Sequence, residues 1–254
     1  MPRTALITGA AGGIGRVVAA RFVADGYRVV GVDVADPGLD GVAYCRADVT
    51  NPTEVSDAVR AAAPEGGAVD VLVACAGVTE GRPLHLTTTQ EWNAVLEANL
   101  GSVFLCVREV LPGMISAGSG RVIAIGSVLH KTAAPGLPAY AAAKGAVAAL
   151  TRQLAVDYGQ YGISFVTISP GWVGTPATES RLDGAGDLER LRQSNPLGIL
   201  GSPEQVAAAV LFAASPDAAL LNGSEMVLDG GASAVSPASL LRDAHRQRMG
   251  LPPL

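Results

Sequence analysis

A glycine-rich turn near the start constrains the fold of this chain more than any other feature. Residues 4–8 (TALIT) are a short apolar run typical of a buried strand, and residues 13–25 have the apolar spacing of a helix. The turn between them reads GxxxGxG, from Gly9 to Gly15. Glycine lets the main chain turn tightly and approach a pyrophosphate, whose negative charge is stabilised at a helix N-terminus. The pattern predicts a dinucleotide-binding site, although such a turn can also be purely structural.

The rest of the chain alternates strands with helices. Apolar runs predict further strands at residues 28–33, 41–46, 69–74, 121–125, 164–169 and 224–228. Capping signals and apolar spacing predict further helices at about 51–63, 88–114, 139–150 and 202–214. Strands that are apolar on both faces belong in a parallel sheet between two helix layers. Because no linker or repeat divides residues 1–254, we expect one domain with a doubly wound, Rossmann-type α/β fold of about seven strands.

Composition excludes several classes of function. The formal net charge of −5 argues against a general nucleic-acid binder. The cysteines form no CxxC pair and lie in apolar runs, so we expect reduced thiols and a cytoplasmic location. The histidines lack metal-ligand spacing, so no metal is expected. No apolar run is read as long enough to span a bilayer, and the first residues lack the pattern of a secretory signal.

Asp33 indicates which dinucleotide the site prefers. It ends the second predicted strand about 20 residues after the glycine turn, where a carboxylate can accept hydrogen bonds from the adenosine ribose hydroxyls. The same carboxylate would repel a 2′-phosphate. Arginines that could receive that phosphate are absent from two expected positions, which hold Gly12 and Val34. We therefore expect NAD rather than NADP, the alternative being an ordinary loop aspartate.

Three residues in the middle of the chain could perform chemistry together. Tyr140 and Lys144 lie four residues apart in an alanine-rich predicted helix, so they share a face, and an ammonium beside a phenol favours the phenolate. Ser127 ends the predicted strand before that helix. Each residue also has a plainer interpretation. The tyrosine can be half exposed beside a surface lysine, and the serine can be a turn residue.

Taken together, these motifs resemble those of the classical short-chain dehydrogenases/reductases, from about residue 4 to residue 231. The matching segments are TGAAGGIG (8–15), Asn99, Ser127, Tyr140 with Lys144, PGWVGT (170–175) and DGG (229–231). The resemblance implies that Tyr140 exchanges a proton with the substrate oxygen. It implies that Lys144 stabilises the phenolate and holds the nicotinamide ribose, and that Ser127 hydrogen-bonds the reacting oxygen. Asn99 would support a water that links Lys144 to solvent.

The resemblance also implies a set of cofactor contacts. They are Gly9, Ala11, Gly12, Gly13, Ile14, Gly15, Asp33, Val34, Asp48, Val49, Ala74, Ala76, Gly77, Tyr140, Lys144, Pro170, Gly171, Val173 and Thr175. Asp48 and Val49 would flank the adenine, and Val173 and Thr175 would contact the carboxamide. Asp48 could instead be a residue that starts the helix beginning near Asn51.

Two segments depart from the family pattern. Ala74-Cys75-Ala76-Gly77 replaces the usual Asn-Asn-Ala-Gly, so the hydrogen bonds of two amide side chains must be replaced or absent. Ile199 stands where an arginine is common, which predicts an altered surface or subunit contact.

The segments expected to select the substrate and to form subunit contacts carry weaker sequence signals. We expect residues 176–200 to form a mobile lid, whose arginines (Arg181, Arg190 and Arg192) either meet an anionic substrate or are solvated. His130 is either a second acid/base or a loop histidine with one main-chain bond. Apolar residues surround the long predicted helix and suggest burial in a homodimer or homotetramer: Val103, Phe104, Leu105, Val107, Val110 and Leu111. The tail, residues 236–254, is either frayed or reaches a partner.

The sequence thus predicts an NAD(H)-dependent oxidoreductase that interconverts a small secondary alcohol and its ketone. A 3-oxoacyl-carrier-protein-type reductase is the alternative among enzymes, and Asp33 argues against its usual NADPH. A non-catalytic NAD(H)-binding sensor is the alternative from a different class. Nucleic acid and membrane are not expected partners.

Overall fold

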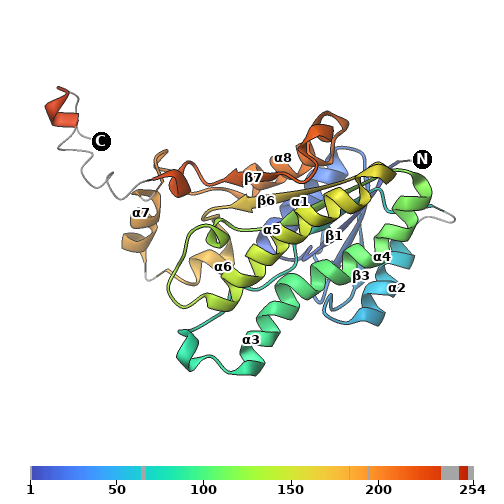
Figure 1. Cartoon of the computed structure of the whole chain (residues 1–254), viewed down its shortest axis with the longest axis horizontal. Coiled ribbons are helices and arrows are strands. Elements are labelled where there is room, and N and C mark those ends of the chain that lie inside the picture. The colour runs from blue at the N-terminus through green and yellow to red at the C-terminus, as the bar shows by residue number, and fades with distance from the viewer. Residues whose placement is uncertain (1, 64–66, 183, 194, 236–245, 251–254) are drawn as a thin grey trace.

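A single parallel sheet of seven strands organises the chain (Figure 1). The computed structural model describes residues 2–63, 67–182, 184–193, 195–235 and 246–250. The strands, in the spatial order β3-β2-β1-β4-β5-β6-β7, are β1 (Thr4–Thr8), β2 (Arg28–Asp33), β3 (Val42–Arg46), β4 (Val71–Ala74), β5 (Gly120–Ile125), β6 (Ile163–Pro170) and β7 (Glu225–Leu228). Every expected strand is present, and the predicted doubly wound α/β fold is confirmed.

Helices connect successive strands, except that a loop joins β2 to β3. They are α1 (Gly13–Ala24), α2 (Pro52–Ala62), α3 (Thr89–Leu96), α4 (Ser102–Ala117), α5 (Pro138–Tyr158), α6 (Pro176–Glu179), α7 (Ala185–Gln193) and α8 (Pro203–Ala214). The predicted caps are present: the Asn51 side chain caps α2, and Thr88 and Ser202 each form a capping box. The helix expected at 88–114 is divided by a π-helical turn, η2 (Glu97–Gly101).

Two hydrophobic cores lie on the two faces of the sheet. Leu6, Val30 and Leu72 point to one face and pack against α2, α4 and α5. Ile7 and Val29 point to the other face and pack against α1 and α8. Successive residues of a strand point to opposite faces, so strands that are apolar throughout require a helix layer on each side.

Most of the apolar α4 residues that were expected to pack against another subunit are buried within their own chain. Five of them have exposed fractions of 8% or less: Val103, Leu105, Val107, Val110 and Leu111. The expectation that all six need another subunit is therefore wrong, because α4 is enclosed by α2, β4 and β5. Phe104 alone remains exposed, at 50%.

The expectation that no apolar run could span a bilayer also needs correction. Residues Thr89–Ala117 form a continuous helical stretch of 29 residues that is long and apolar enough by length and composition, with 44% of its most apolar window buried inside the fold. That stretch contains α4, which is a core helix here.

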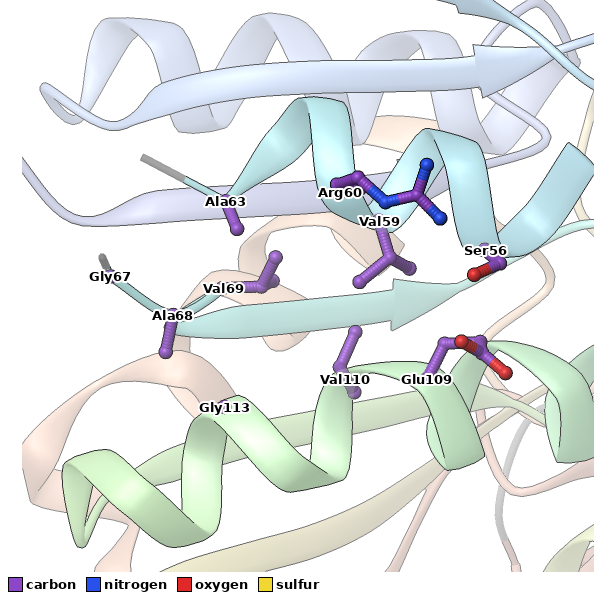
Figure 2. Close-up of a pocket in the computed structure, with 10 residues that line it drawn as sticks. All are labelled: Ser56, Val59, Arg60, Ala63, Gly67, Ala68, Val69, Glu109, Val110 and Gly113. Atoms are coloured by element: carbon purple, nitrogen blue, oxygen red, sulfur yellow. The ribbon is translucent and has the colours of Figure 1, made fainter. Parts of the chain in front are cut away.

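The carboxyl ends of the strands, where site residues are expected, meet at one edge of the sheet. A cavity of about 240 Å³ lies at the opposite edge, between α2, the residues before β4 and α4 (Figure 2). The strand order reverses between β1 and β4, and in open parallel sheets a ligand binds at the carboxyl ends beside such a reversal. Of the predicted tail at 236–254, only residues 246–250 are described.

Candidate active site

The glycine turn after β1 leaves no room for a side chain at Gly9 or Gly15. Gly9 has φ +67°, and a Cβ there would lie 2.9 Å from main-chain atoms of Ala76. A Cβ on Gly15 would lie 2.1 Å from the carbonyl oxygen of Gly9. The N-cap of α1 is Gly12, which has no side chain to cap the first N–H groups of this helix. Those N–H groups can therefore bind an anion.

Thr8 fixes the end of β4 beside that turn. Its hydroxyl oxygen accepts hydrogen bonds from the main-chain nitrogens of Cys75 (3.1 Å) and Ala76 (3.2 Å). These bonds hold the segment from Ala74 to Gly77 without the two amide side chains usual in the family. Burial raises the pKa of the Cys75 thiol to about 11, outweighing the nearby Lys144 charge, so the thiol is neutral at pH 7.

Asp33 lies where β2 ends, against the glycine turn. Its carboxylate accepts hydrogen bonds from the main-chain nitrogens of Ala11 (2.9 Å) and Ala35 (3.1 Å). The sequence pattern did not indicate two arginines that bond the loop after Asp33. Arg16 donates to the carbonyl of Pro37, and Arg46 donates to the carbonyl of Val34 at 3.4 Å. Arg16 lies on α1 and Arg46 lies on β3, so the fold brings both to a loop from which they are distant in sequence.

Lys144 and Tyr140 lie together on α5, as their spacing predicts. Lys144 is 5% exposed, and its Nζ donates to the carbonyl of Ile125 at 2.9 Å. That nitrogen lies 5.6 Å from the centre of the Tyr140 ring. Burial lowers the pKa of the Lys144 ammonium to about 8. Lys144 is therefore not the solvated surface lysine of the plainer interpretation.

The π-helical turn η2 places Asn99 close to Lys144. Its amide nitrogen donates to the carbonyls of Val78 and Val95, each at 2.9 Å. Its Oδ1 is buried and has no hydrogen-bond partner among the described residues. A Cβ on Gly77 would lie 2.5 Å from that oxygen and 3.6 Å from the Lys144 Nζ. Asn99, Gly77 and Lys144 thus border one small polar space, and π-helical turns often occur at functional sites.

Ser127 makes the contact of a turn residue and also keeps a proton that it can donate. Its Oγ accepts a hydrogen bond from the main-chain nitrogen of Leu129 at 3.2 Å, as a turn residue does, and caps the 3₁₀ turn η3 (Val128–His130). A hydroxyl that accepts this bond can still donate its own proton. The carboxyl end of β5 brings it to the same edge as Lys144, which bonds the carbonyl of Ile125 two residues earlier.

The segment after β6 closes the site on the remaining side. A Cβ on Gly13 would lie 2.8 Å from the Thr175 Cβ, so this segment contacts the glycine turn. Val173 is 6% exposed and bridges to Gly201, and a Cβ on Gly171 would meet Asp229 at 2.9 Å. Close packing at these glycines orders the Pro170–Thr175 segment against the predicted cofactor site.

Asp48 lies in a local turn and does not itself start the helix. It is exposed, and its carboxylate accepts hydrogen bonds from the Thr50 main-chain nitrogen (2.9 Å) and hydroxyl (2.7 Å). Asn51 is the actual N-cap of α2. Asp48 therefore makes a local turn just before the helix, and the neighbouring Val49 packs against the core.

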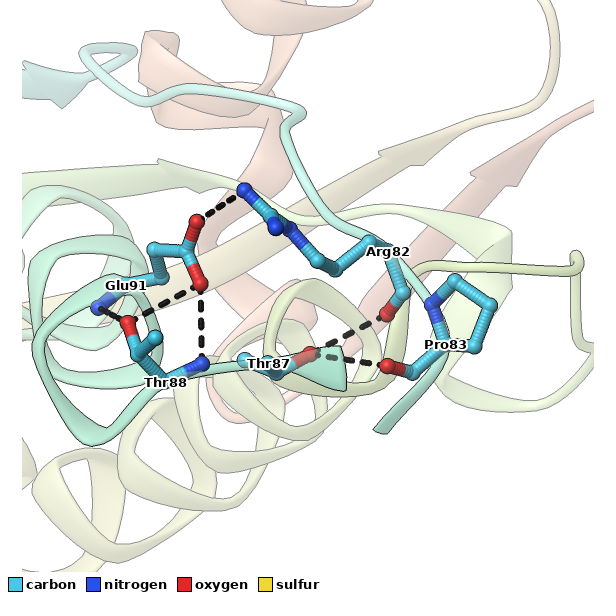
Figure 3. A network of polar contacts seen from close by, with 5 residues as sticks. All are labelled: Arg82, Pro83, Thr87, Thr88 and Glu91. Atoms are coloured by element: carbon cyan, nitrogen blue, oxygen red, sulfur yellow. Dashed lines mark hydrogen bonds and ion pairs between the residues drawn. The ribbon is translucent and has the colours of Figure 1, made fainter. Parts of the chain in front are cut away.

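The segment predicted as a lid contains two helices, α6 and α7. Arg181 donates to the carbonyl of Thr79 in the loop after β4. Arg190 pairs with Asp187 at 3.4 Å, and Arg192 is exposed. The loop itself is held by the Arg82–Glu91 ion pair and by Thr87 and Thr88 (Figure 3).

A nicotinamide dinucleotide fits the residues at this edge. The glycine turn can hold the pyrophosphate and Asp33 a ribose, while Lys144, Tyr140 and Ser127 lie on the elements farther along the sheet. No group of three or more metal-ligating side chains gathers among the described residues.

Comparisons with known proteins agree with this geometry. The family model described as "Enoyl-(Acyl carrier protein) reductase" matches residues 9–233. The chain is 38% identical over 250 residues to 2-(R)-hydroxypropyl-CoM dehydrogenase of Xanthobacter autotrophicus, covering 92% of this chain and 100% of that protein. It is 34% identical over 237 residues to the 3-oxoacyl-[acyl-carrier-protein] reductase of Vibrio cholerae, covering 90% and 96%.

Solved structures give the same answer. An oxidoreductase of the short-chain dehydrogenase/reductase family from Burkholderia thailandensis has a TM-score of 0.85 and 36% identity, covering 95% of this chain and 97% of that one. The chain belongs to the short-chain dehydrogenase/reductase family. Levodione reductase, with a TM-score of 0.87 and 33% identity, covers 92% and 98%. This short-chain dehydrogenase/reductase is therefore an oxidoreductase acting on CH–OH groups.

Proposed function

We propose that this enzyme uses NAD(H) to interconvert a small secondary alcohol and its ketone, with Tyr140 as the general acid/base. The observation that carries the proposal is the buried Lys144 ammonium. It lies 5.6 Å from the Tyr140 ring and is anchored on the β5 end that leads to Ser127. A cation is costly to bury, so its presence beside a phenol calls for a function that uses the charge.

The residues divide the chemistry among them. The nicotinamide, when bound, supplies or accepts the hydride. In ketone reduction, Tyr140 donates its hydroxyl proton to the carbonyl oxygen, and the Ser127 hydroxyl donates a hydrogen bond to the same oxygen. The Lys144 ammonium stabilises the phenolate that remains, and in alcohol oxidation that phenolate takes the proton back. The unpartnered Oδ1 of Asn99 suits a water that connects Lys144 with solvent.

Cofactor choice follows from Asp33. Its carboxylate lies against the glycine turn, where it can accept hydrogen bonds from ribose hydroxyls and oppose a 2′-phosphate. NAD(H) is the proposed cofactor on this basis. Arg16 and Arg46 already bond main-chain carbonyls of the following loop, those of Pro37 and Val34.

The enzyme is proposed to be a cytoplasmic homotetramer or homodimer. Cys45, Cys75 and Cys106 are free thiols, which suits a reducing compartment. The half-exposed Phe104 borders a shallow apolar depression with Leu96 and Leu100, and such a surface fits another subunit.

The alternatives have weaker support. The reductase relatives that act on carrier-linked acyl groups share 34% identity with this chain, but Asp33 and the net charge of −5 do not favour NADPH or an acidic carrier. A sensor that only binds NAD(H) has no need of Ser127, Tyr140 and Lys144 together.

A substrate panel tests the proposal. Ketones are assayed with NADH and NADPH in parallel, and secondary alcohols with NAD. We expect turnover with NADH, and a loss of about 10²–10⁴-fold in kcat for a Tyr140→Phe enzyme that still binds NADH. A fully active Tyr140→Phe enzyme contradicts the mechanism, and binding without turnover across the panel favours the sensor.

A further inference from the structure

Arg181 joins two segments that lie on different sides of the candidate site. It follows α6, in the segment after β6, and its guanidinium donates a hydrogen bond to the main-chain carbonyl of Thr79, in the loop after β4. In the sheet, β5 lies between β4 and β6, and it ends two residues before Ser127. The bond therefore connects the segments that flank the strand leading to Ser127.

The short helix α6 depends on contacts at its two ends. Its N-cap is Thr175, whose Oγ1 accepts a hydrogen bond from the Thr178 main-chain nitrogen at 3.2 Å. The Thr175 Cβ would lie 2.8 Å from a Cβ on Gly13, so this end of the helix packs on the glycine turn. A helix of four residues is not stable in water by itself. The contact of Arg181 with the loop after β4 holds the other end.

The carbonyl that Arg181 binds belongs to a segment that borders Asn99. Thr79 follows Val78, whose own carbonyl accepts a hydrogen bond from the Asn99 amide at 2.9 Å. A Cβ on Gly77 would lie 2.5 Å from the Asn99 Oδ1. The bond from Arg181 is therefore made to the peptide group next to the one that fixes Asn99.

The bond between Arg181 and Thr79 is suited to form and break during turnover. Arginine keeps its charge at any pH at which the enzyme is folded, so the donor is always present. Arg181 is exposed, and the four residues of α6 are exposed or partly exposed. A single exposed hydrogen bond contributes little to the stability of a fold, so this one can open while the core stays intact.

An arginine at this place could instead bind an anionic group of the substrate. Two carboxylates disfavour that role, because Glu80 follows Thr79 and Glu179 lies two residues before Arg181. Negative charges so close in sequence to both bonded groups oppose the approach of an anion. A carbonyl acceptor, as the structure shows, needs no such charge.

We propose that Arg181 is a positioning residue that latches the predicted lid: its bond to the Thr79 carbonyl holds α6 beside the end of β5 and steadies the segment that fixes Asn99. The latch opens when the dinucleotide enters or leaves and closes over the bound cofactor. Its effect on turnover rests on the proposed function, whereas its existence in the cofactor-free enzyme does not.

Hydrogen–deuterium exchange of the cofactor-free enzyme tests the latch without any substrate. The main-chain N–H groups of residues 178–181 bond within their own segment, so they exchange when that segment opens. In Arg181→Ala we expect them to exchange about 5–10-fold faster than in the wild type, the factor that one lost hydrogen bond gives. Arg181→Lys retains a charged donor and should exchange at an intermediate rate.

Arg190→Ala is the matched control for this experiment. Arg190 lies in the same predicted lid, its side chain is 83% exposed, and it pairs with Asp187 on its own helix. We expect residues 178–181 of this variant to exchange as in the wild type. Wild-type exchange in Arg181→Ala, or the same increase in Arg190→Ala, overturns the proposal.

Cofactor release and ketone reduction then test the effect on turnover. In stopped-flow fluorescence we expect Arg181→Ala to release NADH about 5–10-fold faster than the wild type, with a fall of about the same size in kcat/KM for the ketone, because closure of a lid retains and orients what it covers. Arg181→Lys should recover part of both losses, and Arg190→Ala should behave as the wild type. Unchanged NADH release in Arg181→Ala overturns the positioning role.

A ketone with a carboxylate and its neutral ester separate the latch from a substrate contact. For 4-oxopentanoate and its methyl ester, Arg181→Ala should reduce kcat/KM by the same factor, and a loss confined to the carboxylate overturns the latch in favour of an anion-binding arginine. If neither compound is reduced, NADH release decides. A wild-type enzyme that neither binds NADH nor reduces any ketone counts against the proposed function, while the exchange result stands by itself.

Discussion

Lys144 shows at the scale of one residue how function and stability oppose each other. The side chain is almost fully buried, its charged form is disfavoured by burial, and among the described residues it donates a hydrogen bond to the carbonyl of Ile125. A neutral side chain of similar size would pack there at lower free energy. The ammonium is nevertheless the group that a phenolate at Tyr140 requires.

Replacing this lysine should therefore separate activity from stability. The folded pKa of about 8 is below the ordinary 10.5, so between these values the unfolded chain binds more protons and this group's contribution to stability rises with pH. Below pH 8 the penalty is constant at about 3 kcal/mol. Lys144→Met removes it but leaves the Ile125 carbonyl unpaired, at about 1–2 kcal/mol.

We expect Lys144→Met to be about 1–2 kcal/mol more stable than wild type in urea unfolding at pH 7, with turnover abolished. At pH 10.5 the stability difference should shrink, because the wild-type lysine is then neutral when folded. A variant that is clearly less stable at pH 7 contradicts this account of the buried charge.

Asp33 provides the residue-scale test of cofactor choice. Asp33→Ala removes the acceptor for the ribose hydroxyls and the repulsion of a 2′-phosphate, so the preference for NADH over NADPH should fall at least about tenfold, equivalent to 1.4 kcal/mol. The measurement is kcat/KM with each cofactor. Arg46→Ala is the control for the arginine nearby, and it should weaken NADPH more than NADH. An unchanged preference in Asp33→Ala shows that the carboxylate does not select the cofactor.

At the scale of elements, two helical glycines have opposite roles. A Cβ on Gly15 in α1 would lie 2.1 Å from the Gly9 carbonyl oxygen, and that main-chain atom cannot move without opening the turn. A Cβ on Gly145 in α5 would lie 3.8 Å from the His130 Cβ, an ordinary contact. The same substitution therefore tests turn packing in one helix and intrinsic helix propensity in the other.

Gly145→Ala should stabilise the enzyme by about 0.5–1 kcal/mol, because alanine loses less conformational freedom in a helix. Gly15→Ala should destabilise it by about 1–3 kcal/mol and weaken NADH binding, because overpacking displaces the phosphate turn. Thermal unfolding and NADH titration measure both effects. Equal stability changes in the two variants would contradict the contrast.

Sequence patterns predicted most elements because their signals are local. The caps at Asn51, Thr88 and Ser202 are side-chain bonds to neighbouring N–H groups, and the helices begin where these residues predict. The π-helical turn η2 was not predicted, since nothing in the composition of Glu97–Gly101 distinguishes it from α-helix. The interrupted pattern of residues 176–200 predicts a mobile lid, which stays a prediction; the helices α6 and α7 and the contact of Arg181 with Thr79 were not predicted.

Across the whole molecule, contacts between residues close in sequence were predictable, and contacts between distant residues were not. Tyr140 and Lys144 are neighbours by helical spacing, and the glycine turn is continuous in sequence. The hydrogen bond of Thr8 to Cys75 and the ion pair of Lys131 with Glu225 join residues that only the strand order brings together. Burial of the α4 residues was misassigned to another subunit because a sequence pattern does not show how many elements of its own chain surround a helix.

The remaining exposed apolar surface predicts how copies assemble. Phe104→Glu places a charge beside Leu96 and Leu100, so we expect it to lower the oligomeric state observed for the wild type. Light scattering after size exclusion gives the mass of each species. Leu220→Glu, at an almost fully exposed position on η5 (Pro216–Leu221), is the control and should not change it. A monomeric wild type, or an unchanged mass for Phe104→Glu, contradicts the assembly proposal.

The wide turn that carries Asn99 holds one residue more than an α-helical turn and keeps the two halves of the helix around it nearly in phase. Deleting one residue, for example Ala98, would therefore restore regular winding and leave α3 and α4 packed as they are. Val95 would stay in the core, but the local main chain that directs the Asn99 amide to the carbonyls of Val78 and Val95 would be lost. We therefore expect such a deletion to preserve the fold and to lower activity, which would separate the contribution of this turn to the site from its contribution to stability.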